Sequence, residues 1–358
     1  MHNKNAIIVL VACSMMFAVS IVPLTDPSEV SATSPIVITD SAGHQITLNA
    51  PAEHVVTMGF AFTLTVMDLG GTDKIVGYDR YSTYGYNGDE RMEALEGIAM
   101  LGTGYNSDKA SLISGLVQLV EGGLFDKDTD VVFMNNFSST LATGAVYDNL
   151  VAEGYKVICL GAKTYEESID VVEDISDAIG LDSSGSVSNM TSARDTVIEN
   201  IADIAEEDRP RAIYISVTGD TIKVYNSGLA VSMMEMCGAT NAGSNGSSVT
   251  SYNSDTSAVI QANPDVVFLD GNYDGTADDF KEEFSLPSSF NVYKLDKDWN
   301  NPCPGMAAGL EAVYIQLYHT PLYGDGGSLI SENGALIAVS IVTLIAIIAV
   351  AVVLVRRH

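Results

Sequence analysis

The sequence predicts an α/β protein with two similar lobes, and three observations support that prediction. Short apolar segments typical of strands alternate with helical periodicity along most of the chain. One strand core occurs twice, as Asp130-Val-Val-Phe133 and again as Asp265-Val-Val-Phe268. A helix-rich stretch, residues 164–209, separates the two runs of alternation. A four-residue match also arises by chance, but the alternation around both copies favours one core strand in each of two lobes.

The first lobe is expected over residues 33–163. It opens with a hairpin, in which "IVITD" and "QITL" flank a Ser-Ala-Gly turn. Strands are expected at "HVVTM", "KIVGY", "DVVFM" and "KVICL", and helices over residues 63–69, 109–121 and 140–153. This order predicts a mostly parallel sheet covered on both faces.

The helical connection and the second lobe follow at residues 164–209 and 210–323. Apolar residues at helical spacing predict helices over 165–180 and 186–207, and Pro210 ends the second. Strands are then expected at "AIYISV", "DVVFL" and "NVYKL", with helices over 229–237, 256–262, 276–283 and 304–319. The predicted fold class is therefore α/β, with two Rossmann-like lobes joined by a long helix.

Both ends of the chain carry membrane signals. Lys4 precedes an apolar run over residues 6–22 and a small-residue site at 30–32, which predicts a signal peptide over residues 1–32. A retained N-terminal anchor is the alternative. Residues 335–355 contain no charge and would form about 30 Å of helix, enough to span a bilayer. Because Arg356 and Arg357 follow, we expect a transmembrane anchor with an extracellular ectodomain, a cytoplasmic C-terminus and a tether at residues 324–334.

Composition argues against several function classes. The chain of 358 residues carries a net charge of −29, which would repel a nucleic-acid backbone. It has no G-x-S-x-G, H-E-x-x-H or Cys-x-x-Cys motif, so we predict no catalytic residues, no cofactor and no enzyme activity. The histidines His44, His54 and His319 lie far apart in sequence, and no metal site is predicted, although a three-histidine site stays an alternative.

Three of the four cysteines lie beyond the predicted signal peptide. Cys159 ends an apolar strand pattern and is expected to be a buried thiol. Cys237 and Cys303 lie in the same half of the chain and are candidates for a disulfide, which an extracellular location permits.

The order of these parts resembles the helical-backbone substrate-binding proteins of ABC importers, in the class that captures vitamin B12, haem and iron–siderophore complexes. The matching segments are "VITDSAGHQITLNAPAEHVVTMG", "MDLGGTDKIVGYDRYSTYG", "MMEMCGATNAG", "AVIQANPDVVFLDG" and "DWNNPCPGMAAGLEAVYIQLYHTPLY". The resemblance implies binding of a metal chelate or corrinoid between the lobes and delivery to a permease with a separate ATPase.

Two features depart from that family. The resemblance implies an acidic docking residue for the permease on each lobe, and the nearest matches here are Asp108 and Asp255 rather than glutamates. The predicted C-terminal span replaces the lipid anchor common in bacteria and would suit an archaeal cell-surface protein. A sensor or adhesion protein that kept the fold without transport is the alternative function.

The segment "YDRYSTYGY" after a predicted strand is the strongest candidate for ligand contact. Tyrosines offer flat apolar area and a hydroxyl, and an arginine binds carboxylate or phosphate in a bidentate manner. Arg80, Tyr81 and Tyr84 are therefore expected to hold a large, partly planar anion, with an ordinary surface loop as the alternative.

Other candidates follow strand ends, where open α/β sheets bind ligands. Phe60 and Phe62 would line the cleft or pack under the sheet. The remaining ligand candidates are Asn136, Thr218, Asp270, Tyr273 and Trp299, the last being the single tryptophan of the chain.

Overall fold

The computed structural model describes residues 34–83, 90–103, 108–135 and 141–323. The predicted signal peptide, tether and transmembrane anchor therefore lie outside the described residues, as do Tyr84 and Asn136. Within the described ranges, no helix has the length and apolar character needed to cross a membrane.

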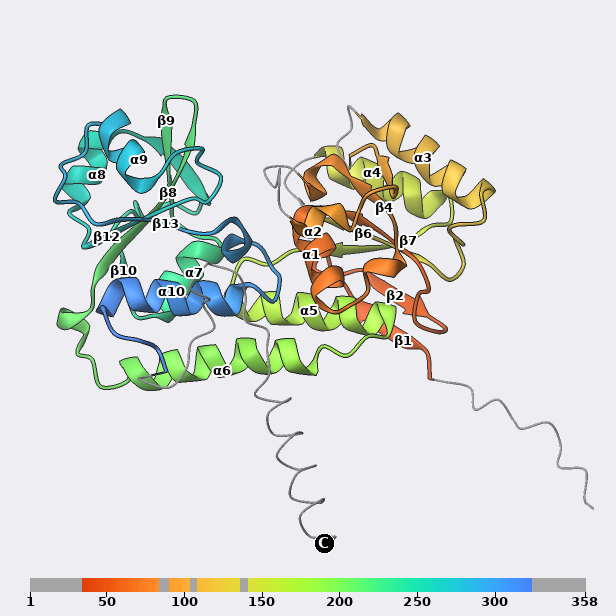
Figure 1. Cartoon of the computed structure of the whole chain (residues 1–358), viewed down its shortest axis with the longest axis horizontal. Coiled ribbons are helices and arrows are strands. Elements are labelled where there is room, and N and C mark those ends of the chain that lie inside the picture. Colours follow the sequence, from red (N-terminus) through yellow and green to blue (C-terminus); the bar gives the residue numbers. More distant parts are fainter. Residues whose placement is uncertain (1–33, 84–89, 104–107, 136–140, 324–358) are drawn as a thin grey trace, which may run out of the picture. The chain divides into compact units, whose positions relative to one another are not determined.

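The first lobe is built on a five-stranded parallel sheet in the order β5-β4-β3-β6-β7. Figure 1 labels β4, β6 and β7 of this sheet, together with the helices α1 to α4. Its strands are β3 (Val55–Met58), β4 (Ile75–Asp79), β5 (Ala99–Leu101), β6 (Val131–Asn135) and β7 (Lys156–Leu160). Its helices are α1 (Phe60–Asp68), α2 (Glu90–Glu93), α3 (Lys109–Glu121) and α4 (Leu141–Ala152). The predicted hairpin, β1 (Ile36–Thr39) and β2 (Gln45–Leu48), is antiparallel and precedes this sheet.

Two helices connect the lobes, where the sequence predicted helical structure. These are α5 (Tyr165–Ile179) and α6 (Ser184–Ile201), which pack against each other. The buried residues of α5 divide along its length: Ile169 packs in the core of the second lobe, whereas Ile175 and Ile179 pack in the core of the first. One helix therefore contributes to the apolar cores of both lobes.

The second lobe is built on a mixed sheet in the order β11-β9-β8-β12-β13, with β10 beside β8. Its strands are β8 (Arg211–Thr218), β9 (Thr221–Tyr225), β10 (Thr240–Asn241), β11 (Ser251–Ser254), β12 (Val266–Leu269) and β13 (Val292–Lys294). Its helices are α7 (Leu229–Met236), α8 (Thr256–Ala262), α9 (Ala277–Glu283) and α10 (Met306–Tyr318).

The antiparallel strands β9 and β11 are a departure from the sequence prediction. β8 turns into β9 through Gly219 and Asp220, and Thr218 pairs with Thr221 across the turn. Gly219 has φ +55°, a backbone conformation that glycine adopts at low cost and that tight hairpins need. The Gly-Asp pair between two strand-like segments is the signal that predicts this hairpin.

The repeated strand core has the same place in both lobes, as the sequence predicted. In β6, Val131 and Phe133 face one apolar cluster while Val132 faces the other. In β12, Val266 and Phe268 likewise face one cluster, and Val267 and Leu269 the opposite one. Each copy is therefore a central strand with both faces buried, which explains the continuous apolar sequence.

Candidate functional site

The buried carboxylate of Asp79 fixes two loops at the carboxyl end of the first sheet. It accepts hydrogen bonds from Gly59 N at 3.1 Å, from Ser82 N at 3.0 Å and from Ser82 Oγ at 2.9 Å. Burial raises the pKa of this carboxyl, and the hydrogen bonds from Ser82 and Gly59 oppose the rise. Asp79 thus holds the loop after β3 against the loop after β4.

Gly59 and Asn135 meet where the strand order of the first sheet reverses. The chain proceeds from β3 toward β4 on one side and from β6 toward β7 on the other, and such switch points are the usual ligand sites of open α/β sheets. Gly59 has φ +130°, and a Cβ at that position would lie 2.6 Å from Asn135 Nδ2. The missing side chain gives the Asn135 amide room at the end of β6.

Arg80 and Tyr81 lie beside this point, in a 3₁₀ turn over Arg80–Ser82. Arg80 Nη2 donates to Tyr81 Oη at 3.0 Å, and the guanidinium carbon lies 4.9 Å from the centre of the Tyr81 ring. The hydrogen bond to Tyr81 raises the pKa of Arg80, which is solvent-exposed. The pair therefore presents a fixed positive charge backed by an aromatic face.

The two phenylalanines have different surroundings. Phe62 has no exposed surface and packs in the core of the first lobe, so the structure supports its packing role rather than ligand contact. Phe60 is 8% exposed and packs with Leu64 and with Cys303, which belongs to the second lobe.

A buried polar network occupies the carboxyl end of the second sheet. Tyr214 donates a hydrogen bond to Asp270 Oδ2, and Asn300 Nδ2 donates to Tyr214 Oη at 2.8 Å. Asn300 Oδ1 in turn accepts from Ala230 N, in the first turn of α7, at 3.0 Å. Burial and the neighbouring Asp270 raise the pKa of Tyr214, so its hydroxyl stays protonated. Thr218 is exposed at the end of β8.

Tyr273 and Trp299 are engaged within the second lobe. Tyr273 donates to Glu283 at 2.6 Å and packs edge-on against Phe280, and burial together with Glu283 raises its pKa to about 12. Trp299 is 6% exposed and belongs to the main core of the lobe, where its Cβ lies close to Gly309. Tyr273 is half-buried and keeps some exposed surface, whereas Trp299 packs mainly inside.

An ion pair joins the lobes close to Trp299. Arg91 Nη1, on α2, lies 2.7 Å from Asp298 Oδ2, in the 3₁₀ turn Lys297–Asn300. The other oxygen of Asp298 is buried and has no hydrogen-bond partner. Sequence reasoning did not find this pair, because its partners are far apart in the chain.

The two predicted docking acids lie at helix N-termini. Asp108 accepts a hydrogen bond from Thr103 N at 2.9 Å, just before α3. Asp255 caps α8 by accepting from Ala258 N at 2.9 Å. Both carboxylates therefore have a local structural role.

The predicted Cys237–Cys303 disulfide is wrong. All three cysteines in the described residues are free and buried. Cys237 lies in the main core of the second lobe with its sulfur 3.8 Å from Leu310 O, whereas Cys303 lies with Phe60 and Leu64. The two thiols thus belong to different clusters. Both cysteines lie in the C-terminal half of the sequence, but the fold does not bring them together.

The three histidines do not converge on one site. His44 pairs with Asp40 at 3.1 Å, and His54 pairs with Asp130 at 3.2 Å. His319 ends α10 in the second lobe. The three-histidine alternative is therefore not supported by the described residues.

Several solved structures of similar architecture are periplasmic binding proteins. Helicobacter pylori CeuE with Ni(II) bound has a TM-score of 0.60 and 16% identity, covering 79% of this chain and 89% of that chain. The fold is that of the periplasmic binding proteins. The vitamin B12 binding protein BtuF of Vibrio cholerae has a TM-score of 0.56 and 18% identity, covering 75% of this chain and 97% of that chain.

A third neighbour extends the range of cargo. The molybdate periplasmic binding protein MolA of Haemophilus influenzae has a TM-score of 0.60 and 17% identity, covering 80% of this chain and 98% of that chain. No family model matches the sequence, and no curated protein matches it significantly. The resemblance to the substrate-binding proteins of ABC importers, inferred from the sequence, is thus confirmed at the level of the fold.

Proposed function

We propose that this chain is the membrane-anchored extracellular substrate-binding protein of an ABC importer, capturing an iron chelate, haem or a corrinoid between its lobes. The observation that carries the proposal is the match to nearly the full length of binding proteins such as BtuF and MolA. A match of that extent includes both lobes and the helices between them. Delivery to a permease with a separate ATPase follows from this function.

The charges at the carboxyl ends support an anionic ligand. The chain has 46 acidic and 17 basic residues, so an exposed arginine at a sheet switch region is a marked local exception. Arg80, backed by Tyr81, offers bidentate hydrogen bonds to a carboxylate or an oxyanion. Asn135 in the first lobe and Thr218 in the second would add neutral polar contacts, and Tyr84 and Asn136 stay proposed ligand residues outside the described ranges.

The test is a calorimetric titration of the purified chain with hydroxocobalamin, haemin, ferric siderophores and molybdate. We expect saturable one-to-one binding of one compound. Arg80→Ala should weaken that binding about 10- to 100-fold, the usual effect of losing a charge-assisted hydrogen bond. Arg194→Ala, which removes the same charge from a surface ion pair on α6, is the matched control and should bind normally. Equal affinities for the two variants would rule out the role of Arg80.

Membrane anchoring has a separate test. Residues 335–355 are proposed to hold the protein in the bilayer, with residues 356–358 inside the cell. The full chain should stay with membranes after alkaline carbonate extraction, and a chain truncated after residue 323 should be released. Release of the full chain would contradict the anchor without touching the ligand proposal.

A sensor or adhesion role is the second candidate. The predicted docking acids Asp108 and Asp255 are engaged as local hydrogen-bond acceptors, which favours this reading over transport. Stimulation of a cognate permease ATPase by the purified chain would favour import. Ligand binding with no such stimulation would favour the sensor.

A further inference from the structure

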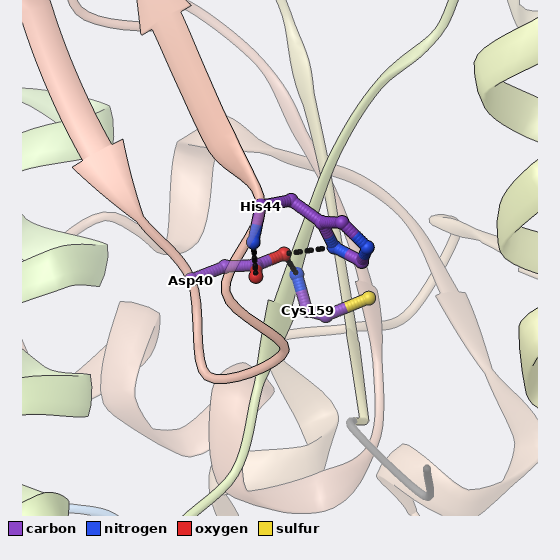
Figure 2. Close-up of side chains that lie close together, drawn as sticks. All are labelled: Asp40, His44 and Cys159. Atoms are coloured by element: carbon purple, nitrogen blue, oxygen red, sulfur yellow. Dashed lines mark hydrogen bonds and ion pairs between the residues drawn. The ribbon is translucent and has the colours of Figure 1, made fainter.

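Three potential metal ligands converge between the turn of the β1–β2 hairpin and the carboxyl end of β7 (Figure 2). Asp40 follows β1, His44 precedes β2, and Cys159 lies in β7. Each offers a ligand atom, and these atoms lie within 4.8 Å of one another. The hairpin and β7 thus bring together a carboxylate, an imidazole and a thiol from distant parts of the sequence.

The carboxylate of Asp40 is already engaged. Its Oδ1 accepts from Ala42 N at 3.0 Å and from His44 N at 2.8 Å. Its Oδ2 accepts from Cys159 N at 3.0 Å and lies 3.1 Å from His44 Nδ1. With these four contacts, Asp40 is suited to orient the imidazole rather than to bind an ion directly.

The imidazole of His44 is held in place with one nitrogen available. In the neutral imidazole, the contact with Asp40 favours the tautomer that carries its proton on Nδ1, and Nε2 is then the nitrogen that can bind a metal. The ring also stacks on Tyr147, with centroids 4.3 Å apart and planes inclined by 12°. The side chain is 42% exposed, so a cation from solvent reaches the ring.

The thiol of Cys159 lies beside that ring, and its sulfur points to the same side as the imidazole in Figure 2. The residue is 4% exposed. A buried cysteine is normally an unreactive thiol unless a cation is bound to its sulfur. A bound cation that replaces the proton would remove the cost of forming a thiolate in this place.

We propose that His44 Nε2 and Cys159 Sγ bind a single soft cation of the Cu(I) class, with Asp40 positioning the imidazole. Sulfur and imidazole together select soft or borderline metals, and a pair of ligands suits Cu(I) better than Zn(II), which prefers four. On binding, the S–H bond breaks, an S–Cu bond forms and one proton leaves to solvent. The oxidation state of copper does not change. The site lies at the carboxyl end of β7, where Cys159 pairs with Met134 of β6, and it does not rest on the proposed transport function.

The test is an anaerobic titration of the full chain with Cu(I) buffered by a chromophoric chelator. We expect one equivalent to bind, with a new ultraviolet absorption from the copper–thiolate bond. Cys159→Ser and His44→Gln should each lower the affinity at least 100-fold and remove or weaken that absorption. Cys237→Ser removes a buried thiol from the second lobe and should bind copper as the unmodified chain does.

Several outcomes would overturn the proposal. An unchanged affinity of His44→Gln for Cu(I) would contradict it. If Cys159→Ser fails to fold, His44→Gln still tests the proposal, because the imidazole is partly exposed and its replacement should leave the fold intact. Equal loss in Cys237→Ser would show that copper binds thiols without regard to this cluster. Tighter binding of Zn(II) than of Cu(I) would show that the class of metal is wrong.

Discussion

In both lobes, an aspartate just before a central strand makes the same kind of hydrogen bond. In the first lobe, Asp130 precedes β6 and its side chain accepts a hydrogen bond from the backbone N–H of His54 at 3.0 Å. His54 is the residue before β3. In the second, Asp265 precedes β12 and accepts from Arg211 N at 2.8 Å, at the start of β8. Each aspartate therefore ties its strand to the neighbouring strand at the amino end of the sheet, which explains why the repeated sequence begins with an acid.

The carboxyl ends of the same strands differ. β6 ends at Asn135, which lies against Gly59. β12 leads to Asp270, which accepts from the buried Tyr214. The amino ends of the two strands have the same stabilising contact, whereas their carboxyl ends differ in chemistry. Each prediction below changes one lobe and uses the other, or a near neighbour, as its reference.

Asp130→Ala should have the largest effect on stability. Its carboxylate is 1% exposed and also accepts from Asp126 N at 2.8 Å, so its loss leaves the backbone N–H groups of His54 and Asp126 without this partner. We expect the free energy of unfolding to fall by about 2–4 kcal/mol in urea denaturation. Asp265→Ala, at an exposed site, should cost only about 0.5–1.5 kcal/mol. Equal costs would mean that the two acids have the same environment.

Tyr214→Phe tests the network of the second lobe. It removes the donor to Asp270 and the acceptor of Asn300 inside the lobe, so we expect a loss of about 1–3 kcal/mol by the same measurement. Tyr225→Phe removes one contact, with Ser216 at 3.1 Å, and is the reference, with a loss below about 1 kcal/mol. A loss in Tyr225→Phe as large as that in Tyr214→Phe would contradict the network's importance.

Gly59→Ala and Gly228→Ala compare the glycines that precede α1 and α7. Both have positive φ, +130° and +124°, so alanine is strained at either site. A Cβ added at Gly59 would lie 2.6 Å from Asn135 Nδ2, whereas a Cβ added at Gly228 would meet open space. We expect Gly59→Ala to cost about 1 kcal/mol more and to weaken ligand binding, because the Asn135 amide must move. A larger loss of unfolding free energy in Gly228→Ala than in Gly59→Ala would contradict this prediction.

The smallest effect is expected for Asp174→Asn, on α5, which serves both cores. Burial and the like charges of Asp170 and Asp177 raise the pKa of Asp174 to about 6 from 3.8. Because the folded-state pKa is above the unfolded one, protonation favours folding, and this contribution is lost as pH rises from about 4 to 6. Asparagine should therefore raise stability above pH 6 by less than about 1 kcal/mol and not below pH 4. Thermal melts above pH 6 and below pH 4 check this, and equal effects of the substitution at the two pH values would contradict it.

The sequence predicted the parts of the fold that depend on local apolar pattern. β6 and β12 were found because a strand buried on both faces is apolar at successive positions. β9 was missed although its sequence, "TIKVY", alternates polar and apolar residues and follows the Gly-Asp turn, because a strand of this length so close behind β8 was not separated from it. β11 was missed because its sequence is mostly polar.

The candidate site was less accessible from sequence. A pattern shows that Phe62 and Trp299 follow strands but not which way their rings point, and both pack inside the lobes. Asp79 and Asn300 were missed because their importance comes from partners distant in sequence. A sequence also gives no distance between two side chains, and for that reason Cys237 and Cys303 were wrongly considered as a disulfide pair.

The placement of α6 has a consequence for synthesis of the chain from its N-terminus. The first-lobe cores use residues up to Leu181, so that lobe can fold as soon as α5 has formed. Met190 and Val197 on α6 pack in a core that also needs α7 and α10. Until Tyr314 emerges, the apolar face of α6 stays exposed to solvent and to other chains. Synthesis of the residues between α6 and Tyr314 is thus the period of greatest aggregation risk, and a chaperone that shields this helix would act then, over roughly 5–20 s at typical synthesis rates.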